Sequence, residues 1–86
     1  MKASDFEEKV WAVEGIRIVL RTDPNTEVKD YDKKNAADAS LRITELLEKR
    51  ITPCIGGSIQ VAVLQGDGEE PHGRVILRTI RNGYKT

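Results

Sequence analysis

Hydrophobic and polar positions alternate early in the chain, in the run EEKVWAVEGIRIVLRT. Two β-branched stretches flank Glu14-Gly15, and this pattern predicts a β-hairpin over about residues 8–21. A two-residue loop would gather one set of side chains on a core face: Trp11, Val13, Ile16, Ile18 and Leu20. A three-residue loop with Gly15 in the left-handed region would shift the pairing by one residue. Both registers remain open at this point.

A helical period replaces the alternation further along, and it predicts a helix over about residues 36–51. Asn35 is expected to cap this helix, with Asp38 three residues later in a capping-box arrangement. Pro53 is expected to end it, because the residue before a proline avoids the α region. One apolar stripe would face the core: Ala36, Ala39, Ile43, Leu46 and Leu47. Two acid-first pairs at i,i+4 would lie on the opposite face: Asp38 with Arg42, and Glu45 with Lys49.

The run SIQVAVLQ predicts a buried strand over about residues 58–65. The segment after it is ambiguous, since RVILRTI is rich in β-branched residues and would suit a strand. Its charges are spaced for a helix, however, at i, i+4, i+7 and i+11: Arg74, Arg78, Arg81 and Lys85. The charge spacing favours a C-terminal helix, and a strand remains the alternative.

These elements predict a single α+β domain over residues 1–86. Its order would be β-hairpin, helix and strand, with the C-terminal helix or strand completing a two-layer sandwich. The composition agrees with this prediction, because 38% of the residues are hydrophobic and 33% are charged. This hydrophobic fraction is enough for one thin core and is too high for a disordered chain. No apolar run approaches the roughly 20 residues of a membrane span, so we expect a cytoplasmic protein that does not act at a membrane.

One helix over a short sheet would leave part of the second sheet face uncovered. In the predicted hairpin this face keeps more apolar residues than a solvated face needs: Val10, Ala12 and Val19. Small domains often enlarge their core by association. The pattern therefore predicts a homodimer that uses this face.

The loop GDGEEPHGRV resembles a phosphate-binding P-loop in its glycine spacing. Its chemistry is wrong for that role, because Arg74 replaces the lysine and Val75 replaces the hydroxyl residue that would hold Mg²⁺. Glu69 and Glu70 would also repel an anion. We therefore interpret the segment as a connecting loop.

Residue types for catalysis are scarce. The chain has one cysteine, Cys54, and one histidine, His72, and they are 18 positions apart. An enzyme would have to bring these two together, or use the Asp67–His72 loop as a ligand or acid–base cluster. Neither has the spacing of a known site, so we predict no enzyme, no cofactor and no metal. A small enzyme using Cys54 or this loop remains an alternative.

The basic residues of the C-terminal segment are the best candidate for partner binding. Arg74, Arg78, Arg81 and Lys85 on one helix face could meet an acidic protein surface. Nucleic acid is the alternative partner, but the net charge is zero, with 14 basic against 14 acidic residues. The sequence thus predicts a small non-catalytic binding or accessory protein, and reversing Arg78 and Arg81 to glutamate is expected to remove partner capture without unfolding the domain.

Three strings, EKVWAVEGIRIVLR, PHGR and LRTIRNGY, resemble small uncharacterised proteins of integron gene cassettes and other mobile elements. The resemblance covers most of the chain. It implies a free-standing bacterial protein, and it implies no activity or functional residue.

Overall fold

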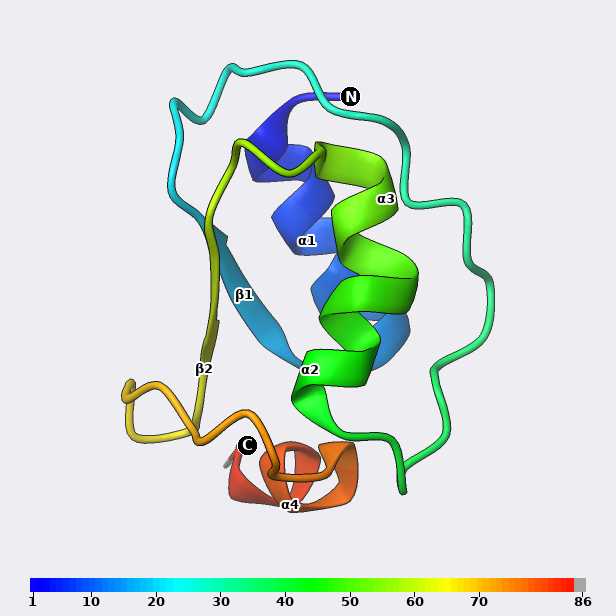
Figure 1. Ribbon diagram of the computed structural model, residues 1–86, viewed down its shortest axis with the longest axis vertical. Coiled ribbons are helices and arrows are strands. Elements are labelled where there is room, and N and C mark those ends of the chain that lie inside the picture. Colours follow the sequence, from blue (N-terminus) through cyan, green and yellow to red (C-terminus); the bar gives the residue numbers. More distant parts are fainter. Residues whose placement is uncertain (85–86) are drawn as a thin grey trace.

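The first element of the computed structural model is a helix, α1 (Ala3–Glu14), and not the first strand of a hairpin (Figure 1). Ala3, Phe6 and Val10 recur at helical spacing and are buried in the core. Gly15 ends the helix with a φ of 70°, and its amide donates to the Trp11 carbonyl over 3.0 Å. The predicted hairpin over residues 8–21 is therefore wrong, and neither of its registers forms. The structure describes residues 1–84.

The sheet has two antiparallel strands, β1 (Arg17–Leu20) and β2 (Val61–Leu64). Ile18 lies opposite Val63, and Leu20 lies opposite Val61. Ile18, Leu20 and Val63 are buried, so this face of the sheet covers the core. Strand β2 lies inside the predicted range of 58–65. It pairs with one short strand after α1, and not with the predicted hairpin.

The middle helix is built from three pieces: α2 (Ile43–Leu46), a π-helical turn η1 (Leu47–Ile51) and α3 (Thr52–Ile55). Pro53 explains the wide turn, since proline lacks an amide and its ring crowds the carbonyl four residues earlier. The predicted end of the helix before Pro53 is wrong, because the chain resumes helical geometry through Ile55.

The predicted start of this helix is also wrong, since residues 36–42 are not helical. The Asp38 carboxylate does not join a capping box with Asn35. It accepts hydrogen bonds from the amide and hydroxyl of Ser40, at 2.8 and 2.7 Å, and forms a turn. Glu45 accepts the Arg42 amide over 3.3 Å at the actual start of α2, and Glu45 and Lys49 form the predicted i,i+4 pair at 3.9 Å.

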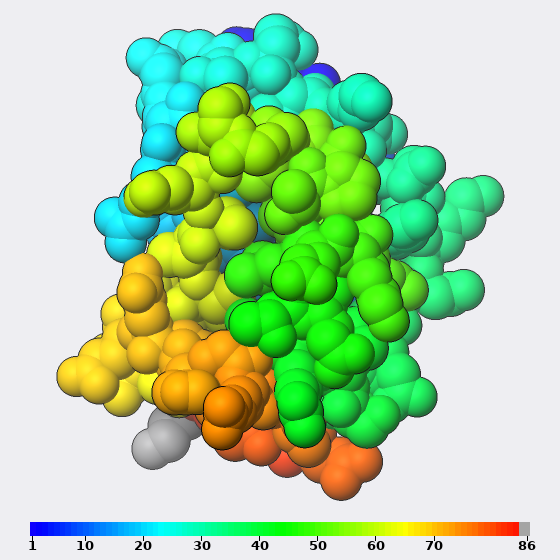
Figure 2. Space-filling model, in the orientation of Figure 1, coloured from blue at the N-terminus to red at the C-terminus, as the bar shows by residue number. Residues whose placement is uncertain are grey.

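The C-terminal segment forms a helix, α4 (Leu77–Gly83), as the charge spacing favours. Figure 1 shows α4 crossing the lower end of the molecule, with the strands on one side and α1 behind the middle helix. The long segment between β1 and α2 passes around the opposite side. Figure 2 shows residues 70–76 against the first turn of α2, where the Thr44 amide donates to the Gly73 carbonyl over 3.3 Å.

The α+β class is thus confirmed, with a core that all of these elements share.

The predicted dimer face is not formed as one surface. Val10 is fully buried between α1 and the rest of the core, whereas Ala12 and Val19 are exposed on different elements. The homodimer itself stays a prediction. Among the described residues, no helix is long and apolar enough to cross a bilayer.

Candidate functional site

A carboxylate is buried where several segments of the chain meet, and no sequence pattern predicted it. Glu14, the last residue of α1, is 1% exposed. Its Oε2 accepts from Arg50 Nη1 over 2.7 Å and from the Tyr31 hydroxyl. Its Oε1 accepts from the Ala37 amide over 2.7 Å and from Arg81 Nη2 over 3.2 Å. We call Glu14, Tyr31, Arg50 and Arg81 the Glu14 cluster.

The Glu14 cluster holds together four segments that are distant in sequence. Arg81 also donates to the carbonyls of Glu14 and Ala37, at 2.7 and 3.0 Å, and so ties α4 to the end of α1. Burial, followed by the bond to the Glu14 carboxylate, raises the pKa of Tyr31 above its ordinary value, so the hydroxyl stays protonated and donates. A buried charge with every oxygen satisfied by fixed donors is typical of a structural ion cluster.

This geometry changes the predicted basic stripe on the C-terminal helix. Arg81 points inward to the Glu14 cluster, and Arg74 lies in the loop before α4 begins at Leu77. Arg78 is exposed on α4, and Lys85 lies outside the described residues. The prediction that all four share one outward helix face is therefore wrong. A partner role for Arg74 and Arg78 stays a prediction.

The polar groups of the Asp67–His72 loop are engaged in local turns and one ion pair. Asp67 accepts the Glu69 amide over 3.0 Å, and Glu70 pairs with Arg21 over 2.9 Å. His72 Nδ1 accepts the Arg74 amide over 3.2 Å. Within residues 1–84, no three His, Cys, Asp or Glu side chains gather closely enough to hold a metal ion.

Cys54 and His72 are not brought together. Cys54 lies near the end of α3, ten residues after Thr44, and Thr44 contacts Gly73. Ten helical residues span about 15 Å. The Cys54 thiol instead lies 3.5 Å from the Arg50 carbonyl and 3.7 Å from the Asp30 carbonyl. Burial, and then the Asp32 carboxylate, raise the pKa of this thiol above its ordinary value.

The raised pKa of Cys54 predicts a thiol that reacts slowly with electrophiles. At neutral pH, iodoacetamide is expected to alkylate Cys54 more slowly in the folded protein than in the urea-unfolded chain, because less thiolate is present. The rate should keep rising as the pH passes the ordinary cysteine value of about 8.5. Mass spectrometry of quenched samples measures both rates. Faster alkylation in the folded protein would instead indicate an activated nucleophile and favour the enzyme alternative.

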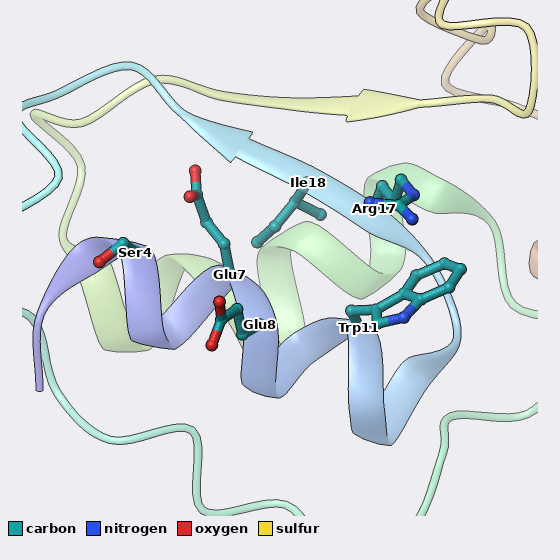
Figure 3. A pocket seen from close by; sticks show the side chains of 6 residues that line it. All are labelled: Ser4, Glu7, Glu8, Trp11, Arg17 and Ile18. Atoms are coloured by element: carbon teal, nitrogen blue, oxygen red, sulfur yellow. The ribbon is translucent and has the colours of Figure 1, made fainter.

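A hollow on the surface lies between α1 and β1, and Figure 3 shows its lining. It has a volume of about 280 Å³, and we call it the Trp11 groove: Ser4, Glu7, Glu8, Trp11, Arg17 and Ile18. Trp11 is 39% exposed and Val19, on β1 beside Arg17, is 38% exposed. Among the described residues, these two are the large hydrophobic side chains that face solvent.

Contacts with neighbouring side chains hold Trp11 in place. The Arg17 guanidinium lies over its ring, with Cζ 4.4 Å from the ring centroid. The Tyr84 ring meets it edge-to-face, at 5.1 Å between centroids and 89° between planes. The Tyr84 hydroxyl accepts the Arg17 amide over 2.8 Å and donates to the Leu64 carbonyl, so it bridges the two strands where they begin to separate.

Sequence reasoning missed this groove because it assigned residues 8–14 to a strand. In helix α1, Glu7 and Trp11 instead lie on one side at i,i+4, with Ser4 and Glu8 beside them. The buried stripe of Ala3, Phe6 and Val10 was the available signal.

A smaller hollow of about 150 Å³ lies between β2 and α2, on the face that Figure 2 shows. Ile43, Leu47 and Val61 line part of it, and Glu70 and Pro71 close one end. It holds no exposed aromatic side chain and no close set of charged groups, so it offers fewer means of recognition than the Trp11 groove.

Comparison with known protein families, with curated proteins and with solved structures finds no match for this chain. The resemblance to integron gene-cassette proteins accordingly stays a prediction.

Proposed function

We propose that this protein is a non-catalytic binding module that captures a polypeptide partner at the Trp11 groove. The observation that carries the proposal is the exposed Trp11, fixed between Arg17 and Tyr84 beside an open hollow. Tryptophan, tyrosine and arginine are the residues that contribute most often to binding energy at protein interfaces. An aromatic ring that is already immobilised loses little conformational entropy when a partner binds.

The charges around the groove favour a polypeptide over nucleic acid. Glu7 and Glu8 line one wall and Arg17 lines the other end, so the groove presents both signs. A nucleic-acid surface needs a continuous basic area to neutralise phosphates. The candidate site therefore moves from the C-terminal arginines to the Trp11 groove, while the association of two copies remains a prediction to be measured alongside.

Selection from a random-peptide display library tests this proposal, with counter-selection on a Trp11→Ala variant. Because Trp11 is the single tryptophan, we expect selected peptides to shift its fluorescence emission to shorter wavelength. Trp11→Ala should weaken binding by roughly 30-fold, the effect of losing an interface residue worth about 2 kcal/mol. Thermal melting checks that the variant is folded.

Thr52→Ala, an exposed change on α3, serves as the matched control and should leave binding unchanged. Light scattering after size exclusion, with and without single-stranded oligonucleotides, reports association of two copies and nucleic-acid binding in parallel. Peptides that bind Trp11→Ala as well as the parent protein, or no enrichment at all, would contradict the proposal.

A further inference from the structure

Strand β1 has an outer edge that β2 does not cover. Backbone groups alternate in direction along a strand, and in β1 the odd-numbered residues face β2. The Arg21 amide donates to the Gln60 carbonyl over 2.8 Å, and the Arg17 amide reaches Leu64 through the Tyr84 hydroxyl. The even-numbered residues Ile18 and Leu20 therefore direct their amides and carbonyls away from β2.

This outer edge runs along the Trp11 groove. Both backbone groups of Leu20 are already occupied, because its amide donates to Glu7 Oε2 over 2.7 Å and its carbonyl accepts the Thr22 amide over 2.8 Å. Ile18 lines the groove, between the Glu7 and Trp11 side chains that rise from α1 (Figure 3). Ile18 is 5% exposed, and no strand of the described residues pairs with this edge. A strand edge without a strand partner is a template for pairing with another extended segment. The Glu7 carboxylate and the Thr22 amide limit this template to the backbone of Ile18.

The charges of the groove are ordered along the same edge. Helix α1 and β1 run in opposite directions, so Glu7 lies beside Leu20, at the end of β1, and Trp11 lies beside Arg17, at its start. Glu8 is exposed on the same side of α1 and forms no ion pair among the described residues. A guest strand antiparallel to β1 would enter beside Glu7 and Glu8 and leave beside Arg17.

Building on the proposed function, we propose that the partner is an extended peptide segment that adds to the outer edge of β1. The guest pairs its backbone with Ile18 in the antiparallel direction. Side chains two residues apart in a strand lie on the same face of the sheet. A lysine or arginine two residues before the guest residue that pairs with Ile18 therefore lies on the α1 side of the sheet and meets Glu8. The carboxyl-terminal side of the guest lies by Arg17 and packs on Trp11. Charge complementarity thus selects a basic strand.

Three blocked hexapeptides test the proposal in ¹H–¹⁵N spectra of the full chain. The first is acetyl-Thr-Lys-Thr-Val-Thr-Val-amide, the second has glutamate in place of lysine, and the third carries an N-methyl group on the central valine. We expect the lysine peptide at millimolar concentration to shift the Ile18 amide and the Trp11 indole resonances. The glutamate peptide should bind at least about tenfold more weakly, the equivalent of 1.4 kcal/mol. N-methylation should abolish binding, since it removes a backbone donor.

Glu8→Lys, an exposed change, provides the matched charge reversal and should make the glutamate peptide the better ligand. A shift of the indole resonance that ignores N-methylation would overturn strand addition while leaving the proposed function in place. No shift with any of the three peptides overturns strand addition as well, and the display selection then decides the proposed function separately. A concentration-dependent Ile18 shift without peptide would assign the edge to a second copy of this chain and overturn the proposal.

Discussion

Replacing Glu14 with alanine is expected to lower the free energy of unfolding by about 3–5 kcal/mol, the cost of breaking a buried ion cluster by removing one partner. The loss leaves Arg50 and Arg81 without the carboxylate that they share, and Tyr31 without its acceptor. Small domains are stable by only about 5–15 kcal/mol, so this loss is a large fraction of the total. Urea denaturation followed by circular dichroism measures the change.

Three further substitutions isolate the cause, two of them as matched controls. Glu8→Ala removes an exposed carboxylate from the same helix and should change the free energy of unfolding by less than about 0.5 kcal/mol. On α4, Arg81→Ala should cost roughly 1.5–3 kcal/mol through lost charged hydrogen bonds, whereas Arg78→Ala should stay within about 0.5 kcal/mol. A loss below 1 kcal/mol for Glu14→Ala would mean that water replaces the carboxylate at little cost, and would refute the structural role.

Gly66→Ala is expected to destabilise the protein by about 1–3 kcal/mol through overpacking. A Cβ on Gly66 would lie 2.0 Å from the carbonyl oxygen of Gly83, at the end of α4, and this neighbour is backbone that cannot rotate away. The end of α4 must then shift, and Tyr84 with it. Because Tyr84 contacts Trp11, we expect the tryptophan emission to change as well as the melting temperature.

Gly57→Ala is the control for this substitution, because nothing lies within 4 Å of its added Cβ. It should change the free energy of unfolding by less than about 1 kcal/mol. Equal melting temperatures for Gly66→Ala and the parent protein would show that α4 moves without cost, and would contradict tight docking of the C-terminal segment.

The C-terminal arginines have different roles in the structure. Reversing Arg78 and Arg81 together would not be a test of partner binding alone, because Arg81→Glu would bring a second carboxylate against buried Glu14. Arg78 and Arg81 both fit the helical charge spacing of the sequence. In the structure, Arg81 binds buried Glu14, whereas Arg78 is exposed. Among the described arginines of the predicted stripe, Arg74 and Arg78 can be changed without disturbing the Glu14 cluster.

Several features of this protein follow from the sequence alone. The strand around Val61 and Val63 and the core positions Ile43 and Leu46 appear where apolar periodicity predicts them. The i,i+4 pair of Glu45 and Lys49 and the C-terminal helix also form as predicted. Each of these depends on neighbours within about one turn of helix or on one face of a strand, and such interactions are encoded locally.

The tertiary structure decided the rest. Residues 8–14 alternate like a strand, but burial of Phe6 and Val10 against the shared core makes them helical, since packing of an amphipathic face outweighs local propensity. In the sequence, Glu14 resembles an ordinary turn residue. Only the fold brings Tyr31, Arg50 and Arg81 around it. The Trp11 groove likewise exists only because α1 lies along the edge of β1. Glu14 meets Arg81, and Trp11 meets Tyr84, across most of the length of the chain, and no local sequence pattern specifies contacts of this kind.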